Sequence, residues 1–171
     1  MLLQNLRRTL LALTAVALLA PPVALAQGPE PDDLMAAFGR RTGGTPDMTV
    51  VHLNDLTTDL LFEAPSKYSL RAQARQATMF YVQGTAQEDV TLDLLIEVIG
   101  AQRYTGRMVS IQNFEPGAEL SAGDPFIGLI TIDALLPPQE GMRVNIGDRV
   151  VEFTFTANQL AWLDEAANPG E

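Results

Sequence analysis

The sequence predicts a mainly β domain, either an antiparallel sandwich or a barrel, with short helices near its N- and C-terminal ends; an α+β fold is the alternative. At least six segments are rich in β-branched or aromatic residues and are separated by turn signals at the spacing of all-β domains. No long helical pattern alternates with these segments, which disfavours a doubly wound parallel sheet.

Residues 1–26 have the features of a signal peptide. Arg7 and Arg8 precede an apolar run that ends at Pro21-Pro22, and Ala24-Leu25-Ala26 offers the small residues that a signal peptidase reads. The run is shorter than the ~20 residues that a membrane span needs. We therefore expect a soluble protein exported to the periplasm or the extracellular space, and the sequence leaves open whether cleavage occurs at Ala26.

Three further parts are expected after this segment. Residues 27–47 are interpreted as a flexible lead-in with a possible short helix, because Asp32 and Asp33 suit a helix N-terminus and Gly43-Gly44 would end it. Residues 48–165 form the single β-rich domain. Residues 166–171 form a tail.

The clearest strand signals lie in the second half of the chain. In 90–100, every other residue from Leu92 to Val98 is apolar, which is typical of a strand buried on one side. Apolar Leu95 and Ile99 on the other side indicate that the second face is partly covered as well. The remaining predicted strands are 79–84, 107–114, 126–136 and a hairpin over 141–155 with its turn at Gly147-Asp148.

One segment carries competing signals for a strand and a helix, and the C-terminal segment carries a helical signal. Residues 69–77 alternate like a strand but consist of strong helix formers; we favour the strand because the neighbouring segments are strands. Thr156 and Gln159 form a capping box before a short C-terminal helix. We expect Trp162, on that helix, to seal an open end or edge of the sheet.

The only histidine, His52, precedes three acids at helical spacing, Asp55, Asp59 and Glu63. A helix would place these four side chains on one stripe. The β-branched residues around His52 instead favour a strand over 48–53 followed by a turn at Asn54-Asp55. We interpret His52 as a surface or partly packed residue beside solvated acids, and not as a catalytic or metal-binding one.

Several chemistries are disfavoured by the residues available. The chain has no cysteine and one histidine, so thiolate sites and two-histidine zinc sites are excluded. No glycine-rich phosphate loop, dinucleotide fingerprint or nucleophile elbow is present. We predict no enzyme activity, cofactor or metal. The candidate binding residues are Arg103, Tyr104 and Arg107, a small basic–aromatic cluster around Gly106, together with Trp162.

The net charge of −10 disfavours nucleic acid and anionic lipid as partners. We expect a non-enzymatic binding or protein-interaction module, whose partner is another exported protein or a glycan, with no stable membrane insertion after signal cleavage. The alternative is a small β-barrel that carries a lipid or another apolar ligand. Its cavity would be lined by Leu95, Ile99, Phe126, Phe153 and Phe155. The ligand, the pathway and the oligomeric state stay open.

Overall fold

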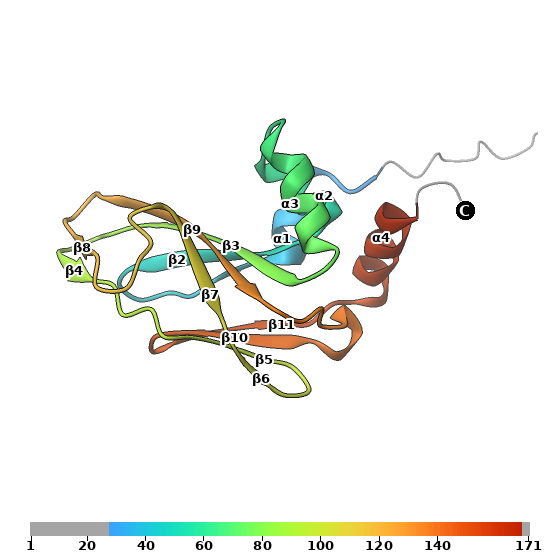
Figure 1. Ribbon diagram of the computed structural model, residues 1–171. Coiled ribbons are helices and arrows are strands. Elements are labelled where there is room, and N and C mark those ends of the chain that lie inside the picture. The colour runs from blue at the N-terminus through green and yellow to red at the C-terminus, as the bar shows by residue number, and fades with distance from the viewer. Residues whose placement is uncertain (1–27, 169–171) are drawn as a thin grey trace, which may run out of the picture.

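Two antiparallel sheets pack against each other in the computed structural model, which describes residues 28–168 (Figure 1). This arrangement confirms the predicted mainly β fold and shows that it is a sandwich. The predicted signal peptide lies outside the described residues. Within them, no helix is both long enough and apolar enough to cross a membrane.

The larger sheet has five strands in the order β1-β2-β3-β9-β7, and each pair of neighbours is antiparallel. The smaller sheet has four strands in the order β11-β10-β5-β6. The strands of the larger sheet are β1 (Gly39–Arg41), β2 (Asp47–Leu53), β3 (Thr78–Thr85), β7 (Arg107–Gln112) and β9 (Pro125–Ile132). Those of the smaller sheet are β5 (Ile96–Ile99), β6 (Arg103–Thr105), β10 (Met142–Ile146) and β11 (Arg149–Phe153).

The remaining elements lie around the sandwich. A two-stranded ribbon, β4 (Val90–Thr91) and β8 (Glu119–Leu120), lies at the end opposite the helices (Figure 1). The helices are α1 (Pro31–Phe38), α2 (Asp55–Leu61), α3 (Ser66–Ala74), α4 (Ala157–Ala167) and the short 3₁₀ helix η1 (Pro138–Glu140).

The larger sheet is buried on both faces near its helical end. Val50 and Phe80 face the smaller sheet, where they join Phe153 in the main core. Their neighbours Val51 and Met79 face the other way and belong to a second cluster that the helices cover. Adjacent strand residues point to opposite faces, so a run of consecutive apolar residues supplies both clusters.

Gly106 marks the point where the chain passes from one sheet to the other. It follows β6 of the smaller sheet and precedes β7 of the larger one. Its N–H donates to the Ile96 carbonyl at 2.9 Å. A Cβ at this position would lie 2.5 Å from Ile96 Cγ2, so only glycine lets the backbone approach this closely.

The predicted strand over 69–77 is wrong, because residues 66–74 form α3. No residue of α3 is fully buried, but Leu70 and Ala74, which lie four residues apart on one face of the helix, pack against the cluster that the helices cover. The helix lies beside α2, where Arg71 and Arg75 pair with Asp59 and Asp55. Intrinsic helix propensity and these ion pairs decide the conformation.

The segment 90–100 is confirmed as alternating and half-buried, although it contains two short strands instead of one. The residues from Leu92 to Val98 that were expected to point inward are buried. The expectation that the other face is also covered is wrong for Leu95, which is 66% exposed. The hairpin of β10 and β11, with its turn at Gly147-Asp148, is confirmed.

α1 lies within the predicted lead-in 27–47 and packs against the larger sheet. Leu34 and Phe38 of α1 are buried against Val51 of the larger sheet. At the other end, Thr156 Oγ1 accepts from the N–H of Gln159, whose side chain accepts from the N–H of Thr156. This capping box confirms the predicted C-terminal helix, which extends to Ala167, inside the predicted tail.

Candidate functional site

His52 lies on the inner face of β2 and is 6% exposed. Its ring centroid lies 5.6 Å from that of Phe80, 6.2 Å from that of Phe153 and 5.6 Å from that of Phe155. The interpretation of His52 as a surface or partly packed residue is therefore wrong, because the side chain is buried. Strand parity places position 52 on the same face as Val50, and that face packs against the smaller sheet.

The acids that follow His52 lie on or just after α2, not on the strand that carries His52. Asn54 ends the strand segment and caps α2, so the expected turn at Asn54-Asp55 is the start of a helix. Asp55 and Asp59 on α2 point to α3, and Glu63 is exposed after the helix. Of the three acids, Asp55 lines a pocket together with His52, whereas Asp59 and Glu63 do not, so the four-residue stripe does not form.

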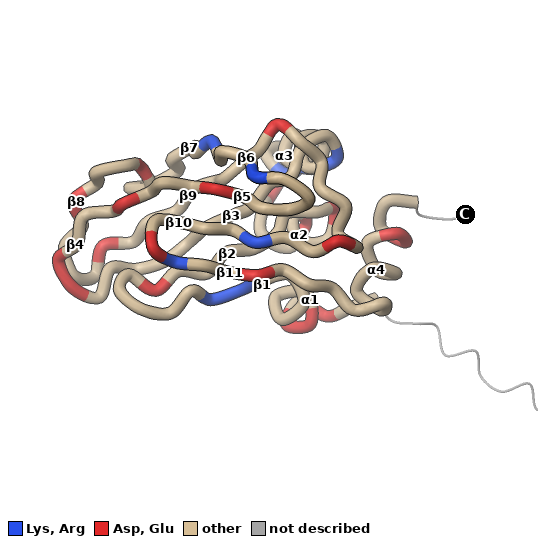
Figure 2. The backbone as a smooth tube through the Cα atoms, turned by 90° about the horizontal axis from the view of Figure 1, so that it is seen from below, with Lys and Arg blue, Asp and Glu red and all other residues tan. Residues whose placement is uncertain are grey.

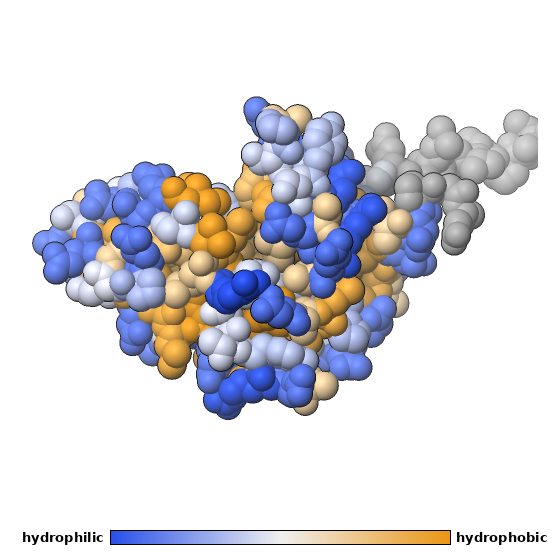
Figure 3. Space-filling view, in the orientation of Figure 1, coloured by the Kyte–Doolittle hydropathy of each residue, from blue (hydrophilic) through white to orange (hydrophobic). Residues whose placement is uncertain are grey.

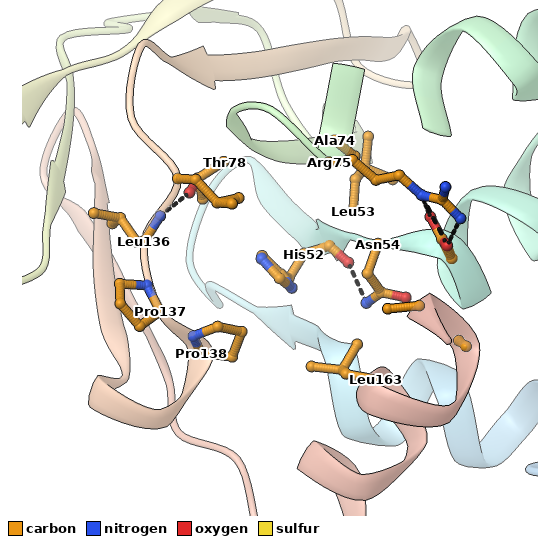
Figure 4. A pocket seen from close by; sticks show the side chains of 14 residues that line it. His52, Leu53, Asn54, Ala74, Arg75, Thr78, Leu136, Pro137, Pro138 and Leu163 are labelled. Carbon is orange, nitrogen blue, oxygen red and sulfur yellow. Dashed lines mark hydrogen bonds and ion pairs between the residues drawn. The ribbon is translucent and has the colours of Figure 1, made fainter. Parts of the chain in front are cut away.

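A pocket of about 410 Å³ opens next to His52, at the helical end of the sandwich (Figure 4). We call it the His52 pocket. It is lined mainly by apolar side chains, among them Leu53 of β2, Leu136 and Pro137 after β9, and Leu163 of α4. In Figure 4 the imidazole points into the space framed by Leu136, Pro137 and Leu163.

Most polar side chains that line this pocket already have hydrogen-bond partners. Asn54 Oδ1 accepts from the backbone N–H of Leu56 at 2.9 Å and of Thr57 at 3.1 Å. Thr78 Oγ1 accepts from the backbone N–H of Leu136 at 2.8 Å. These contacts hold the two side chains in place and occupy their oxygens as acceptors.

The two charged side chains at the pocket wall, Arg75 and Asp55, pair with each other. Arg75 Nε lies 3.1 Å from both carboxylate oxygens of Asp55, and Arg75 Nη2 lies 2.5 Å from Asp55 Oδ2. The carboxylate raises the pKa of Arg75 through this hydrogen bond and the accompanying charge attraction. The wall therefore carries a cation and an anion that neutralise each other.

The imidazole of His52 is the exception among the polar groups. Within residues 28–168, His52 Nδ1 is buried and has no hydrogen-bond partner. Burial lowers the pKa of His52 to about 4. At neutral pH the ring is therefore uncharged, with one nitrogen that donates a hydrogen bond and one that accepts it.

No cluster suited to a metal ion is present in the described part of the chain. No three histidine, aspartate or glutamate side chains there come together around a common point. The single histidine and the lack of cysteine also exclude the ligand set of two histidines and one cysteine that blue-copper sites use.

The predicted basic–aromatic cluster is divided between the two sheets. Arg103 on β6 pairs with Glu97 at 2.8 Å, whereas Arg107 on β7 pairs with Asp133 at 2.5 Å. Tyr104 is half-buried against the main core. Each arginine therefore has its own acidic partner, and the structure does not gather these side chains into one basic surface. Figure 2 likewise shows acidic and basic residues spread over the molecule.

Trp162, the fourth candidate, is half-buried on α4 and packs against the cluster that the helices cover. It is adjacent in sequence to Leu163, which lines the His52 pocket.

In the view of Figure 3, hydrophobic surface extends over the sheets, while the projecting helices α2 and α3 are mostly hydrophilic.

Sequence reasoning missed the His52 pocket because its walls come from segments far apart in the chain: 52–55, 74–78, 135–138 and 163–167. One local signal was available. If 48–53 is a strand with Met48 and Val50 facing inward, His52 must face inward too.

No family model and no curated protein matches the chain. Among solved structures, it is similar to the cupredoxin domain of amoB from Nitrosocaldus yellowstonii, with 14% sequence identity over 70% of this chain and 84% of that chain. The TM-score of 0.29 is too low to support an argument about function.

Proposed function

We propose that this chain is an exported, non-enzymatic binding module that holds a small apolar ligand in the His52 pocket. The observation that carries the proposal is the imidazole of His52, which points into a mainly apolar pocket (Figure 4). Nδ1 is closed off from the surface, so Nε2 is the ring nitrogen through which His52 would contact a ligand. Export rests on the signal-peptide features of residues 1–26.

The size of the pocket supports a small molecule. Its volume of about 410 Å³ lies within the range of ~300–1,000 Å³ that is usual for small-molecule sites. Such sites are typically apolar with a few polar groups that orient the ligand, as is the case here.

The position of this pocket differs from the cavity expected for a barrel carrier. Phe126 and Phe153 are fully buried in the main core, and Leu95 lies at the surface. Phe155 packs against His52 from the side of the smaller sheet. These side chains therefore do not form one cavity lining, and the ligand would bind at the end of the sandwich instead of inside it.

A binding role also fits the acid–base properties of His52 better than catalysis does. A general base works best when its pKa is near the working pH. With a pKa of about 4, His52 is a weak base at neutral pH. An exported protein or a glycan as partner stays a prediction.

The test is titration of purified protein with N-phenyl-1-naphthylamine, a neutral probe that fluoresces in apolar surroundings. Ala166 of α4 lines the pocket, so Ala166→Phe should fill it and abolish the fluorescence increase. Ala161→Phe is the matched control, because Ala161 is exposed on the same helix. Equal probe binding by both variants would reject the proposal.

Native mass spectrometry of the same three proteins provides a second readout. A co-purifying apolar molecule that is present in the wild type and in Ala161→Phe but absent from Ala166→Phe would support the pocket as its site. The same molecule on all three proteins would place it elsewhere.

A further inference from the structure

We infer that the His52 pocket selects neutral ligands with a single hydrogen-bonding group, such as a hydroxyl or a carbonyl, over carboxylates of the same shape. This inference rests on the proposed function, because it names the class of ligand for the same pocket. It follows from which polar groups of the wall are free and from the charges around them.

The first step concerns hydrogen bonds. Asn54 and Thr78 use their side-chain oxygens within the protein, and Asp55 and Arg75 bind each other. The imidazole of His52 points into the pocket, and because Nδ1 is closed off from the surface, Nε2 is the nitrogen that a ligand can reach. A ligand can therefore form a hydrogen bond with Nε2 in mainly apolar surroundings. An uncharged imidazole can donate to a carbonyl or accept from a hydroxyl, so either group satisfies it.

The second step concerns charge. A bound carboxylate would need a cation as its partner, and the cation in the pocket lining is Arg75. Its guanidinium is already held in a two-pronged contact by Asp55, whose side chain is 13% exposed. The Asp55 carboxylate would repel a second anion. Burying a charge without a partner is far more costly than burying a hydroxyl that finds one hydrogen bond.

The third step explains how the selectivity can be changed. Replacing Asp55 with asparagine would free the guanidinium of Arg75 at the pocket wall and remove the repelling charge. The Asp59–Arg71 pair joins the same two helices but is not part of the lining. Asp59→Asn therefore changes the net charge equally without placing a free cation at the pocket.

The experiment compares three ligands that share the naphthalene ring system: naphthalene, 2-naphthol and 2-naphthoate, each titrated calorimetrically at pH 7.5. Salt at 0.5 M screens the general repulsion of anions by the acidic surface. In the wild type, 2-naphthol should bind about three- to tenfold more tightly than naphthalene, as expected for one hydrogen bond. We expect 2-naphthoate to bind at least tenfold more weakly than 2-naphthol.

The variants test each step separately. His52→Phe should remove the advantage of 2-naphthol over naphthalene. Asp55→Asn should strengthen 2-naphthoate binding at least tenfold, and Asp59→Asn should leave it unchanged. Wild-type binding of 2-naphthoate as tight as that of 2-naphthol would overturn the inference, as would a 2-naphthol advantage that survives in His52→Phe. If none of the three ligands binds, the proposed function fails instead.

Discussion

His52 and Phe80 stand directly opposite each other in the register of β2 and β3, with their ring centroids 5.6 Å apart. Phe153 and Phe155 also lie against the imidazole of His52, so three aromatic rings surround it. A phenylalanine would suit this position by packing alone. The histidine adds a buried polar atom, Nδ1, that has no partner among residues 28–168. Because an unsatisfied buried polar atom costs stability, we expect the histidine to serve something other than the fold.

Replacing His52 with phenylalanine should raise the stability of the protein. An unsatisfied buried polar group costs ~1–3 kcal/mol, and part of the gain is lost because the larger ring must be accommodated. We expect the free energy of unfolding at pH 7.5 to increase by about 1 kcal/mol, measured by urea denaturation. A decrease of this size would show that the imidazole contributes to folding.

Thr58 offers a matched control for this variant. Its hydroxyl is also buried without a partner in the described part of the chain, but Thr58 does not line the His52 pocket. Thr58→Val should likewise preserve or raise stability. It should leave binding of N-phenyl-1-naphthylamine and 2-naphthol unchanged, in contrast to the expected effect of His52→Phe on 2-naphthol.

His52 should also make stability depend on pH in a defined window. Burial lowers its pKa from 6.5 in the unfolded chain to about 4 in the folded protein. Between these values the unfolded state binds a proton that the folded state does not, so the free energy of unfolding decreases as the pH falls from 6.5 to 4. The stability that depends on an uncharged His52 is fully present above pH 6.5. It is lost once the pH is below the folded-state pKa, and the full loss amounts to about 3 kcal/mol.

The measurement is urea denaturation at a series of pH values from 4 to 8 for the wild type and His52→Phe. Carboxylates titrate in both proteins, so their effect cancels in the difference. The advantage of His52→Phe should grow steadily below pH 6.5. A difference that stays constant over the whole series would mean that His52 titrates normally in the folded state.

The longer strands can be predicted from the sequence because they have local signals, whereas the short strands β1, β6 and β8 were not among those predicted. Alternation from Leu92 to Val98 and the turn at Gly147 identify strands without any knowledge of their partners. The segment 69–77 shows the limit of this approach. Its conformation depends on a neighbour, since Arg71 and Arg75 find their acidic partners on α2.

The pocket could not be predicted in the same way. Leu53, Leu136 and Leu163 line one space only after the strand, loop and helix that carry them have packed. The burial of His52, by contrast, follows from strand parity once Met48 and Val50 are assigned to the core.

Asn54 should stabilise α2 as its N-cap, a role that the expected turn at this position concealed. Its side chain accepts from two backbone N–H groups at the start of the helix. Asn54→Ala should lower the free energy of unfolding by about 1 kcal/mol, whereas Asn54→Gly should cost only a few tenths. Chemical denaturation of both variants tests this order. Equal losses would show that the capping contacts are not what the asparagine provides.

Gly128 of β9 should be intolerant of even one added methyl group. A Cβ there would lie 2.1 Å from Cδ1 of Phe114, whose ring is fully buried. The Phe114 ring stacks with that of Phe126 at a centroid distance of 6.3 Å, so it cannot retreat without disturbing a second buried ring. We expect Gly128→Ala to cost ~1–3 kcal/mol, the usual range for overpacking, in urea denaturation.

Steric conflict can be separated from the general effect of losing a glycine. Gly28→Ala is the control, since no atom lies within 4 Å of a Cβ built there. Phe114→Ala alone should cost ~3–5 kcal/mol through its cavity. In the double variant the methyl of residue 128 would occupy part of that cavity, so the combined loss should be smaller than the sum by at least about 1 kcal/mol. Additive losses would mean that the two positions do not compete for the same space, and that the absent side chain of Gly128 is not what makes room for the Phe114 ring.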